Sequence, residues 1–142
     1  MVTADGRTSI MWTDDELERV GNAEELQLAS RRPDGTLRKF ITMWVVRDGD
    51  ALYVRSAHGP DNPWYLRALA SGEGRIRAGG VERDVEFGHV EEGDPVHPAL
   101  DQVYRAKYRS HGERTVGTVV GEHVHGLTIR LMPEDEDQDD ID

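Results

Sequence analysis

A hairpin signal between residues 40 and 56 constrains the fold more strongly than any other feature of this sequence. Residues 40–47 (FITMWVVR) are rich in β-branched and aromatic side chains, and residues 51–56 (ALYVRS) repeat that character. The turn sequence Asp48-Gly49-Asp50 lies between the two runs. Both runs are apolar at consecutive positions rather than at alternating ones, so we expect both faces of this hairpin to be covered.

Periodicity predicts four further strands and three helices around the hairpin. A capping-box sequence, Thr13-Asp14-Asp15-Glu16, begins a short helix that we expect Gly21 to end. The other predicted helices cover residues 64–70 and 99–109, and the other predicted strands cover residues 25–31, 74–78, 81–89 and 124–131. Short turns between most of the strands favour antiparallel pairing. The sequence therefore predicts an α+β fold, a six-stranded antiparallel β-barrel with peripheral helices.

The two ends of the chain differ from its middle. Residues 1–12 have little pattern and are expected to form a flexible lead-in, although Trp12 has the size to pack over a neighbouring surface. Residues 134–142 carry seven acids and no base, so we expect a disordered, solvated tail after a single domain over residues 13–133. Without these seven acids the formal charge falls from -11 to -4, which is still negative and argues against nucleic-acid binding.

The composition also limits the cellular compartment and the kinds of site that the protein can have. The chain has no cysteine, which excludes disulfides, thiolate metal sites and a cysteine nucleophile. No stretch approaches the roughly 20 apolar residues that a membrane-spanning helix needs, and no signal-peptide pattern is present. We therefore expect a cytoplasmic protein with no membrane partner.

Residues 37–69 concentrate the groups that bind an anionic, ring-bearing cofactor. Guanidinium, ammonium and hydroxyl groups bind phosphate, and an indole can cover a flat ring. The same residues also have a simpler interpretation, in which the bases form a solvated rim and the tryptophans belong to the core. The candidate cofactor-binding residues are Arg38, Lys39, Thr42, Trp44, Arg55, Ser56, Trp64 and Arg67.

Residues 36–69 resemble the split-barrel flavin/deazaflavin oxidoreductases, the superfamily of pyridoxamine-phosphate oxidase and the deazaflavin-dependent nitroreductases. The nitroreductase patterns "S-x-G-G" and "P-x-W-Y-x-N-L" correspond here to residues 56–59 (SAHG) and 63–69 (PWYLRAL). A closer resemblance is to an uncharacterised, mainly bacterial domain-of-unknown-function family within that superfamily. Its pattern includes "W-V-V", "L-Y-V-R-S" and "Y-R-x-K-Y", and the likeness runs from about Leu17 to Pro133.

This resemblance implies a split β-barrel that forms a homodimer and binds FMN or a deazaflavin (coenzyme F-420) at the subunit seam. It implies that the basic and hydroxyl candidates contact the cofactor phosphate, that Trp64 and Arg67 cover the pocket, and that the protein is an oxidoreductase acting on an unknown small-molecule substrate. The second loop glycine and the asparagine of the nitroreductase pattern are missing, which leaves FMN, deazaflavin or no cofactor open. The alternative is a non-catalytic module that binds a small ligand or another protein on a barrel that has lost its cofactor.

Two other clusters have competing interpretations. Tyr104 and Tyr108 share one face of a predicted helix, where we expect packed tyrosines and solvated bases, with Lys107 or Tyr108 reaching the pocket as the alternative. His123 and His125 are predicted on one face of a strand, about 7 Å apart, where a third ligand would complete a metal site. Accidental His-x-His pairs are common, so we expect no metal. His58, in the loop before the helix at residue 64, is a candidate proton donor.

Overall fold

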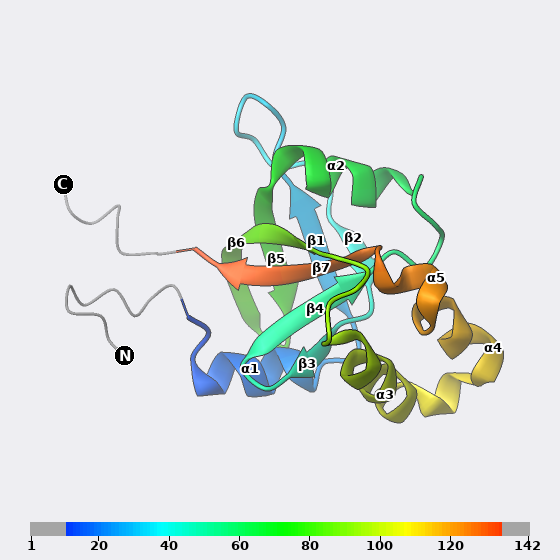
Figure 1. Ribbon diagram of the computed structural model, residues 1–142. Coiled ribbons are helices and arrows are strands. Elements are labelled where there is room, and N and C mark those ends of the chain that lie inside the picture. The colour runs from blue at the N-terminus through cyan, green and yellow to red at the C-terminus, as the bar shows by residue number, and fades with distance from the viewer. Residues whose placement is uncertain (1–10, 135–142) are drawn as a thin grey trace.

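The computed structural model describes residues 11–134, which form one curled antiparallel sheet with helices around it (Figure 1). The helices are α1 (Asp14–Gly21), α2 (Pro63–Ser71), α3 (His97–Lys107), α4 (Glu113–Val116) and α5 (Glu122–His125), with 3-10 turns η1 (Arg109–His111) and η2 (Gly117–Val119). The strands are β1 (Leu26–Ser30), β2 (Ile41–Met43), β3 (Val46–Asp48), β4 (Ala51–Arg55), β5 (Glu73–Ala78), β6 (Val81–Val90) and β7 (Thr128–Pro133).

The order of the strands requires the sheet to curl. All pairs are antiparallel, and the order is β2-β1-β5-β6-β7-β4-β3. In a flat sheet the two edge strands, β2 and β3, would lie about 29 Å apart, because neighbouring strands are about 4.8 Å apart. Only Trp44 and Val45 connect them, so the two edges meet across a seam. The predicted α+β antiparallel split barrel is confirmed.

The predicted strand over residues 40–47 is wrong in one respect, because it is two strands that pair at opposite edges. The break lies at Val45, whose backbone bonds to helix α3 instead of to a neighbouring strand. Its N–H donates to the Tyr108 hydroxyl at 3.1 Å, and its carbonyl accepts from Lys107 Nζ at 2.6 Å. The sheet therefore has seven strands rather than six.

The predicted strand over residues 124–131 is also wrong at its beginning. Residues 122–125 form the helical turn α5, and β7 begins only at Thr128. The Thr128 hydroxyl donates to the Val124 carbonyl at 3.1 Å, a local contact that stabilises the turn just before the strand. His123 and His125 consequently do not lie on a strand.

The other predicted elements agree with the structure to within a few residues. Both hydrogen bonds of the predicted capping box at Thr13 and Glu16 are present, and α1 ends at Gly21. Helix α2 has Pro63 in its first turn and ends against Gly72, whose φ of 76° is favourable only for glycine. Residues 1–10 and 135–142, which hold most of the predicted lead-in and tail, lie outside the described residues.

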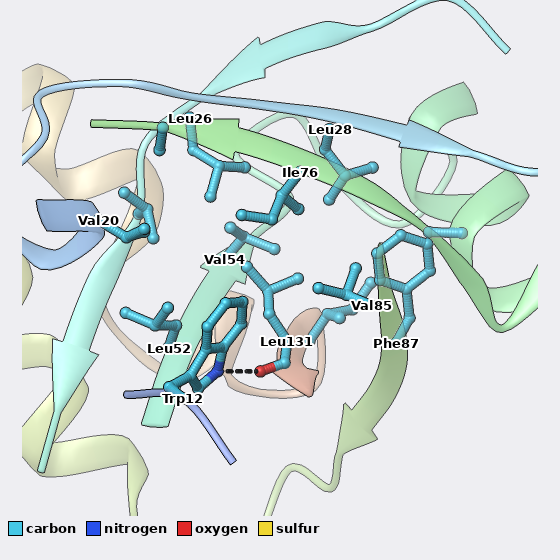
Figure 2. Packing of buried hydrophobic residues seen from close by; sticks show 14 of the residues in the cluster. Trp12, Val20, Leu26, Leu28, Leu52, Val54, Ile76, Val85, Phe87 and Leu131 are labelled. Carbon is cyan, nitrogen blue, oxygen red and sulfur yellow. Dashed lines mark hydrogen bonds between the residues drawn. The ribbon is translucent and has the colours of Figure 1, made fainter. Parts of the chain in front are cut away.

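The main core fills the inside of the curled sheet (Figure 2). Leucine, isoleucine and valine side chains from β1, β4, β5, β6 and β7 meet there and are almost fully buried. Trp12 closes this core from the N-terminal side. Its indole N–H donates to the Leu131 carbonyl at 3.0 Å, which satisfies the one polar atom of a buried ring.

A second core lies on the other face of the β3–β4 hairpin. Alternate residues of β4 point to opposite sides, so Leu52 and Val54 join the main core while Ala51 and Tyr53 pack towards α3. Tyr104 of α3 and Tyr108, which follows the last residue of α3, complete this second core and are fully buried. The expectation of a hairpin covered on both faces is confirmed for β4 and for Val45 and Val46, but not for residues 40–44, which are exposed or half-buried. Within residues 11–134, no helix has the length and apolar character that a membrane crossing requires.

Candidate functional site

A cavity of about 600 Å³ opens beside the seam and is the best candidate for a ligand site. Its wall comes from β2 and the connection that follows it, the end of β4, the start of α2, and residues 114–119. Cavities of about 300–1,000 Å³ are typical of small-molecule and cofactor sites. We call it the seam cavity. Four of the eight predicted residues line it, namely Thr42, Trp44, Arg55 and Trp64.

Two tryptophans give the seam cavity rigid aromatic walls. Trp44 stacks on Tyr108, with ring centroids 3.9 Å apart and planes 4° apart. The Tyr108 hydroxyl donates to the Glu24 carbonyl at 2.8 Å, so the stack is anchored to the loop before β1. Trp64 lies edge-on to Tyr65 at 5.9 Å. Indoles held in this way present apolar surfaces that suit a flat conjugated ring.

The polar part of the seam cavity includes residues that the sequence analysis missed. Arg114, Thr115 and Thr118 line it from α4 and the turn that follows, a segment to which no element was assigned. Arg114 is exposed, and among residues 11–134 it has no carboxylate within ion-pair distance. Residues 38–42 were predicted to bind phosphate because they combine basic and hydroxyl side chains. Arg114 with its neighbouring threonines is the same combination, so the sequence did contain a signal for this part of the site. The candidate His58 also lines the cavity.

Arg55 lines the cavity but donates to the protein itself. Its side chain is buried, and its Nε donates to Thr128 Oγ1 at 2.9 Å. One Nη donates to Asp101 Oδ1 at 2.6 Å and to the Val119 carbonyl at 2.8 Å, and the other contacts His97 Nδ1 at 3.1 Å. At least four of its five N–H groups therefore already have acceptors. Arg55 joins α3, β7 and the 117–119 turn to β4.

The partners of Arg55 form a buried charge cluster with a defined proton arrangement. An arginine can only donate, so His97 Nδ1 accepts and its Nε2 carries the proton that is donated to the Glu91 carbonyl at 2.7 Å. Burial lowers the pKa of His97, which agrees with a neutral ring. The ring stacks on His125 at 4.5 Å.

Asp101 carries the negative charge of this cluster. Burial alone would raise the pKa of Asp101, but hydrogen bonds from His125 at 3.0 Å and from Arg55 outweigh it and lower the pKa. We call Arg55, His97, Asp101 and His125 the buried cluster. Its groups satisfy one another, as buried ions must.

Ser56 and Lys39 line neither the seam cavity nor the pocket described next. The Ser56 hydroxyl is buried and donates to the Gly59 carbonyl at 2.6 Å, which folds the following loop. Lys39 is exposed. Their predicted contacts with a cofactor phosphate stay predictions.

The last two predicted residues, Arg38 and Arg67, lie in a different cavity of about 500 Å³. This cavity lies between the β1–β2 turn, which projects beside α2 in Figure 1, and the outer face of α2. Arg31 and Arg32 also line it, and we call it the arginine pocket. The structure thus divides the eight predicted residues between two cavities and two positions outside them.

The structure also shows where the predicted tyrosine cluster and the predicted histidine pair lie. Tyr104 and Tyr108 pack and Arg105 and Arg109 are exposed, as the packing interpretation predicted, but Lys107 is half-buried and donates to the Val45 carbonyl instead of being solvated. His123 lies on a helical turn, not on the predicted strand. Within residues 11–134 no group of three or more histidine or acidic side chains is arranged to hold a metal ion.

Comparison with known families identifies the chain. Residues 16–131 match the family model described as "Uncharacterized protein conserved in bacteria (DUF2255)". The chain belongs to this family. A comparison with curated proteins found no significant match.

Solved structures show which fold the DUF2255 chain shares. A proposed pyridoxamine 5'-phosphate oxidase from Listeria innocua matches with a TM-score of 0.59 at 16% identity, covering 85% of this chain and 92% of that one. HutZ, a heme storage protein from Vibrio cholerae, matches with a TM-score of 0.57 at 17% identity, covering 87% and 92%. A FAD-binding protein from Mesorhizobium loti matches with a TM-score of 0.56 at 15% identity, covering 87% and 91%. At these identities the likeness establishes the split-barrel fold alone.

Proposed function

We propose that the seam cavity binds FMN or a deazaflavin and that the protein is an oxidoreductase acting on a small molecule. The observation that carries this proposal is the pair of immobilised indoles, Trp44 and Trp64, lining a cavity of about 600 Å³ at the seam of the barrel. The fold is shared with a FAD-binding protein and with a proposed pyridoxamine 5'-phosphate oxidase. These likenesses make a flavin the first ligand to test.

The residues of the cavity have the chemistry that such a ligand needs. Trp44 and Trp64 provide apolar faces for the ring and exclude water from it. Thr42 and Thr115 provide hydroxyls for its polar edge, and Arg114 provides a cation for its phosphate. When bound, a flavin or deazaflavin would itself supply the hydride-transfer chemistry, and the protein would position it.

This assignment moves the phosphate contact away from Arg55. At least four of the N–H groups of Arg55 already have acceptors within the protein, so a phosphate would have to displace Asp101 or Thr128. Arg114 has no such partner in the described part of the chain. We therefore propose Arg114 as the principal cation of the seam cavity.

Titration of the purified protein with FMN, and separately with deazaflavin, tests the proposal. Two of the three tryptophans line the cavity, so binding should quench tryptophan emission. Arg114→Ala should weaken binding by about tenfold, the effect of losing one charge-assisted contact. Arg130→Ala is the matched control, because Arg130 is exposed on β7 and lines neither cavity. Absence of quenching with both ligands would contradict the proposal.

A homodimer is part of the same proposal. Ile41, Leu66 and Leu69 are large apolar residues that remain 38%, 48% and 39% exposed, on β2 and α2. Ile41 lies on an edge strand and also lines the seam cavity, so a second copy covering it would narrow the opening. Light scattering after size-exclusion chromatography should give twice the monomer mass of 16.0 kDa, and Leu69→Glu, at a position that lines neither cavity, should shift the protein towards the monomer.

A non-catalytic ligand-binding module is the second candidate function. The engagement of Arg55 in the buried cluster and of Ser56 in its own loop favours it, because two predicted cofactor contacts serve the fold. Reduction of bound FMN or deazaflavin by a hydride donor, followed by reoxidation with an acceptor, separates the two. A ligand that binds and undergoes no redox turnover would favour the module.

A further inference from the structure

We propose that the arginine pocket is a second anion site, which binds a phosphate group independently of any ring ligand in the seam cavity. This goes beyond the proposed function, which concerns the seam cavity alone. The two cavities share no lining residue, and α2 contributes its start to one and its outer face to the other.

The pocket concentrates positive charge in an acidic chain. The whole sequence has 28 acidic and 17 basic residues, yet four arginines and a single acid, Glu73, line this cavity. In the described part of the chain, only Arg31 of the four forms an ion pair, with Asp84 at 3.3 Å. Unpaired like charges held together repel one another, and a bound anion relieves that repulsion.

Local hydrogen bonds hold two of these arginines in place. Arg31 donates to the Gly35 carbonyl at 2.7 Å, and Arg32 donates to the Leu37 carbonyl at 2.8 Å. The turn that carries both is itself fixed, because Asp34 accepts from the backbone N–H and the hydroxyl of Thr36 at 3.0 and 2.7 Å. Each guanidinium keeps further N–H donors for a ligand. Because the turn already holds both side chains in place, binding an anion would cost little additional conformational entropy.

Arg38 provides the second, independent observation. Its Nε is buried and, among residues 11–134, has no hydrogen-bond acceptor. A buried donor without an acceptor is unfavourable and rare, so the Arg38 guanidinium can turn towards a ligand oxygen in the pocket without giving up a hydrogen bond of its Nε. Arg67 faces the same pocket from α2 and is exposed, so it is available to the same anion.

A phosphate group fits these donors best. Its oxygens accept from several guanidinium groups arranged around one point, and arginine binds it through paired N–H groups. Leu66 and Ala70 add apolar surface to the wall, which suits a small organic phosphate. The proposal assigns this phosphate to a free ligand. The phosphate tail of a cofactor that also occupied the seam cavity is the competing source, and the experiment separates the two.

Calorimetric titration of the full chain with inorganic phosphate at constant ionic strength tests the site. Arg38→Ala and Arg67→Ala should each weaken phosphate binding by about tenfold. Arg67 is exposed on a helix, so its variant keeps the test valid if Arg38→Ala does not fold. Arg130→Ala is the control and should bind phosphate like the parent protein.

Three results would overturn the proposal. The first is no phosphate binding by the parent protein, and the second is unchanged affinity in the Arg67→Ala and Arg38→Ala variants. The third is competition between phosphate and FMN together with a loss of FMN affinity in Arg67→Ala, which would make the pocket the phosphate end of the cofactor site. Phosphate affinity that is unaffected by saturating FMN supports an independent site. If the protein binds no flavin, phosphate titration of the same variants still decides this proposal.

Discussion

Arginine side chains have different roles in the buried cluster around Arg55 and in the arginine pocket around Arg38. Both arginines were predicted to hold a cofactor phosphate. Arg55 is 3% exposed and donates to Thr128, Asp101 and a backbone carbonyl. Arg38 has a buried Nε with no acceptor in the described chain and lines an open pocket. The difference shows that a guanidinium serves the fold or a ligand according to whether the protein supplies its acceptors.

Asp101 is the residue that creates this difference. It neutralises Arg55 from helix α3, 46 positions along the chain, and it also binds His125. Nothing comparable reaches Arg38 or Arg67, since within residues 11–134 neither forms an ion pair, and Arg32 has only an electrostatic interaction with the exposed Asp34. A stability test of the two regions should therefore separate them clearly.

The largest effect is expected from removing the guanidinium of Arg55. Arg55→Met should lower the free energy of unfolding by about 3–5 kcal/mol, because Asp101 would be left as a buried charge without its cation. Arg67→Met, the matched substitution in the arginine pocket, should change it by no more than about 0.5 kcal/mol. Urea denaturation followed by tryptophan fluorescence measures both.

Equal stability of the two variants would contradict the conclusion that Arg55 stabilises the fold and Arg67 does not. The double variant Arg55→Met with Asp101→Leu sharpens it, because removal of both charges should recover part of the loss. A double variant as unstable as the sum of the two single ones would show that the ion pair is not the cause.

An intermediate effect is expected from the pH dependence of the buried cluster. The pKa of His97 is lowered by burial, so near pH 6 the unfolded chain binds a proton that the folded protein does not. Stability from this group is therefore complete above about pH 6.5, the ordinary pKa of histidine, and is lost as the pH falls towards the folded pKa.

His97→Gln isolates this contribution. Glutamine can accept from Arg55 and donate to the Glu91 carbonyl, but it does not titrate. Urea denaturation between pH 7.5 and about 5.5 should show a steeper loss of stability in the parent protein than in the variant. Parallel curves would remove His97 from the acid sensitivity of the protein.

The smallest effect extends the comparison to the only two lysines. Lys107 is partly buried beside the seam and its Nζ donates to the Val45 carbonyl at 2.6 Å, whereas Lys39 is exposed. Burial lowers the pKa of Lys107 to about 8. An NMR titration of the lysine side chains should show one signal with a midpoint about two pH units below the ordinary lysine value of about 10.4, and Lys39→Arg should leave that signal in place. A midpoint for Lys107 at the ordinary value would contradict its burial at the seam.

The sequence predicted the candidate site less well than it predicted the fold. It placed Trp44 and Trp64 correctly as neighbours of one cavity, because both belong to the segment that forms the seam. It grouped Arg38 and Arg55 at one phosphate, although they line different cavities. It missed Arg114 entirely, because the short turns around residues 113–119 have no periodic signal.

The sequence by itself determined the local elements of this protein. The capping box begins α1 and Gly72 ends α2. The apolar run of β4, which has no alternation, correctly predicted a core on each face of that strand. These features depend on residues within one or two turns of each other, so they can be read along the chain.

Only the tertiary structure decided where the seam falls and which arginine is left for a ligand. Val45 interrupts the predicted strand because Tyr108 and Lys107, 63 and 62 positions away, bind its backbone. Arg55 is engaged because Asp101 arrives from α3. These hydrogen bonds join residues that are far apart in the sequence and come close only in the folded protein. Local sequence patterns therefore do not predict them.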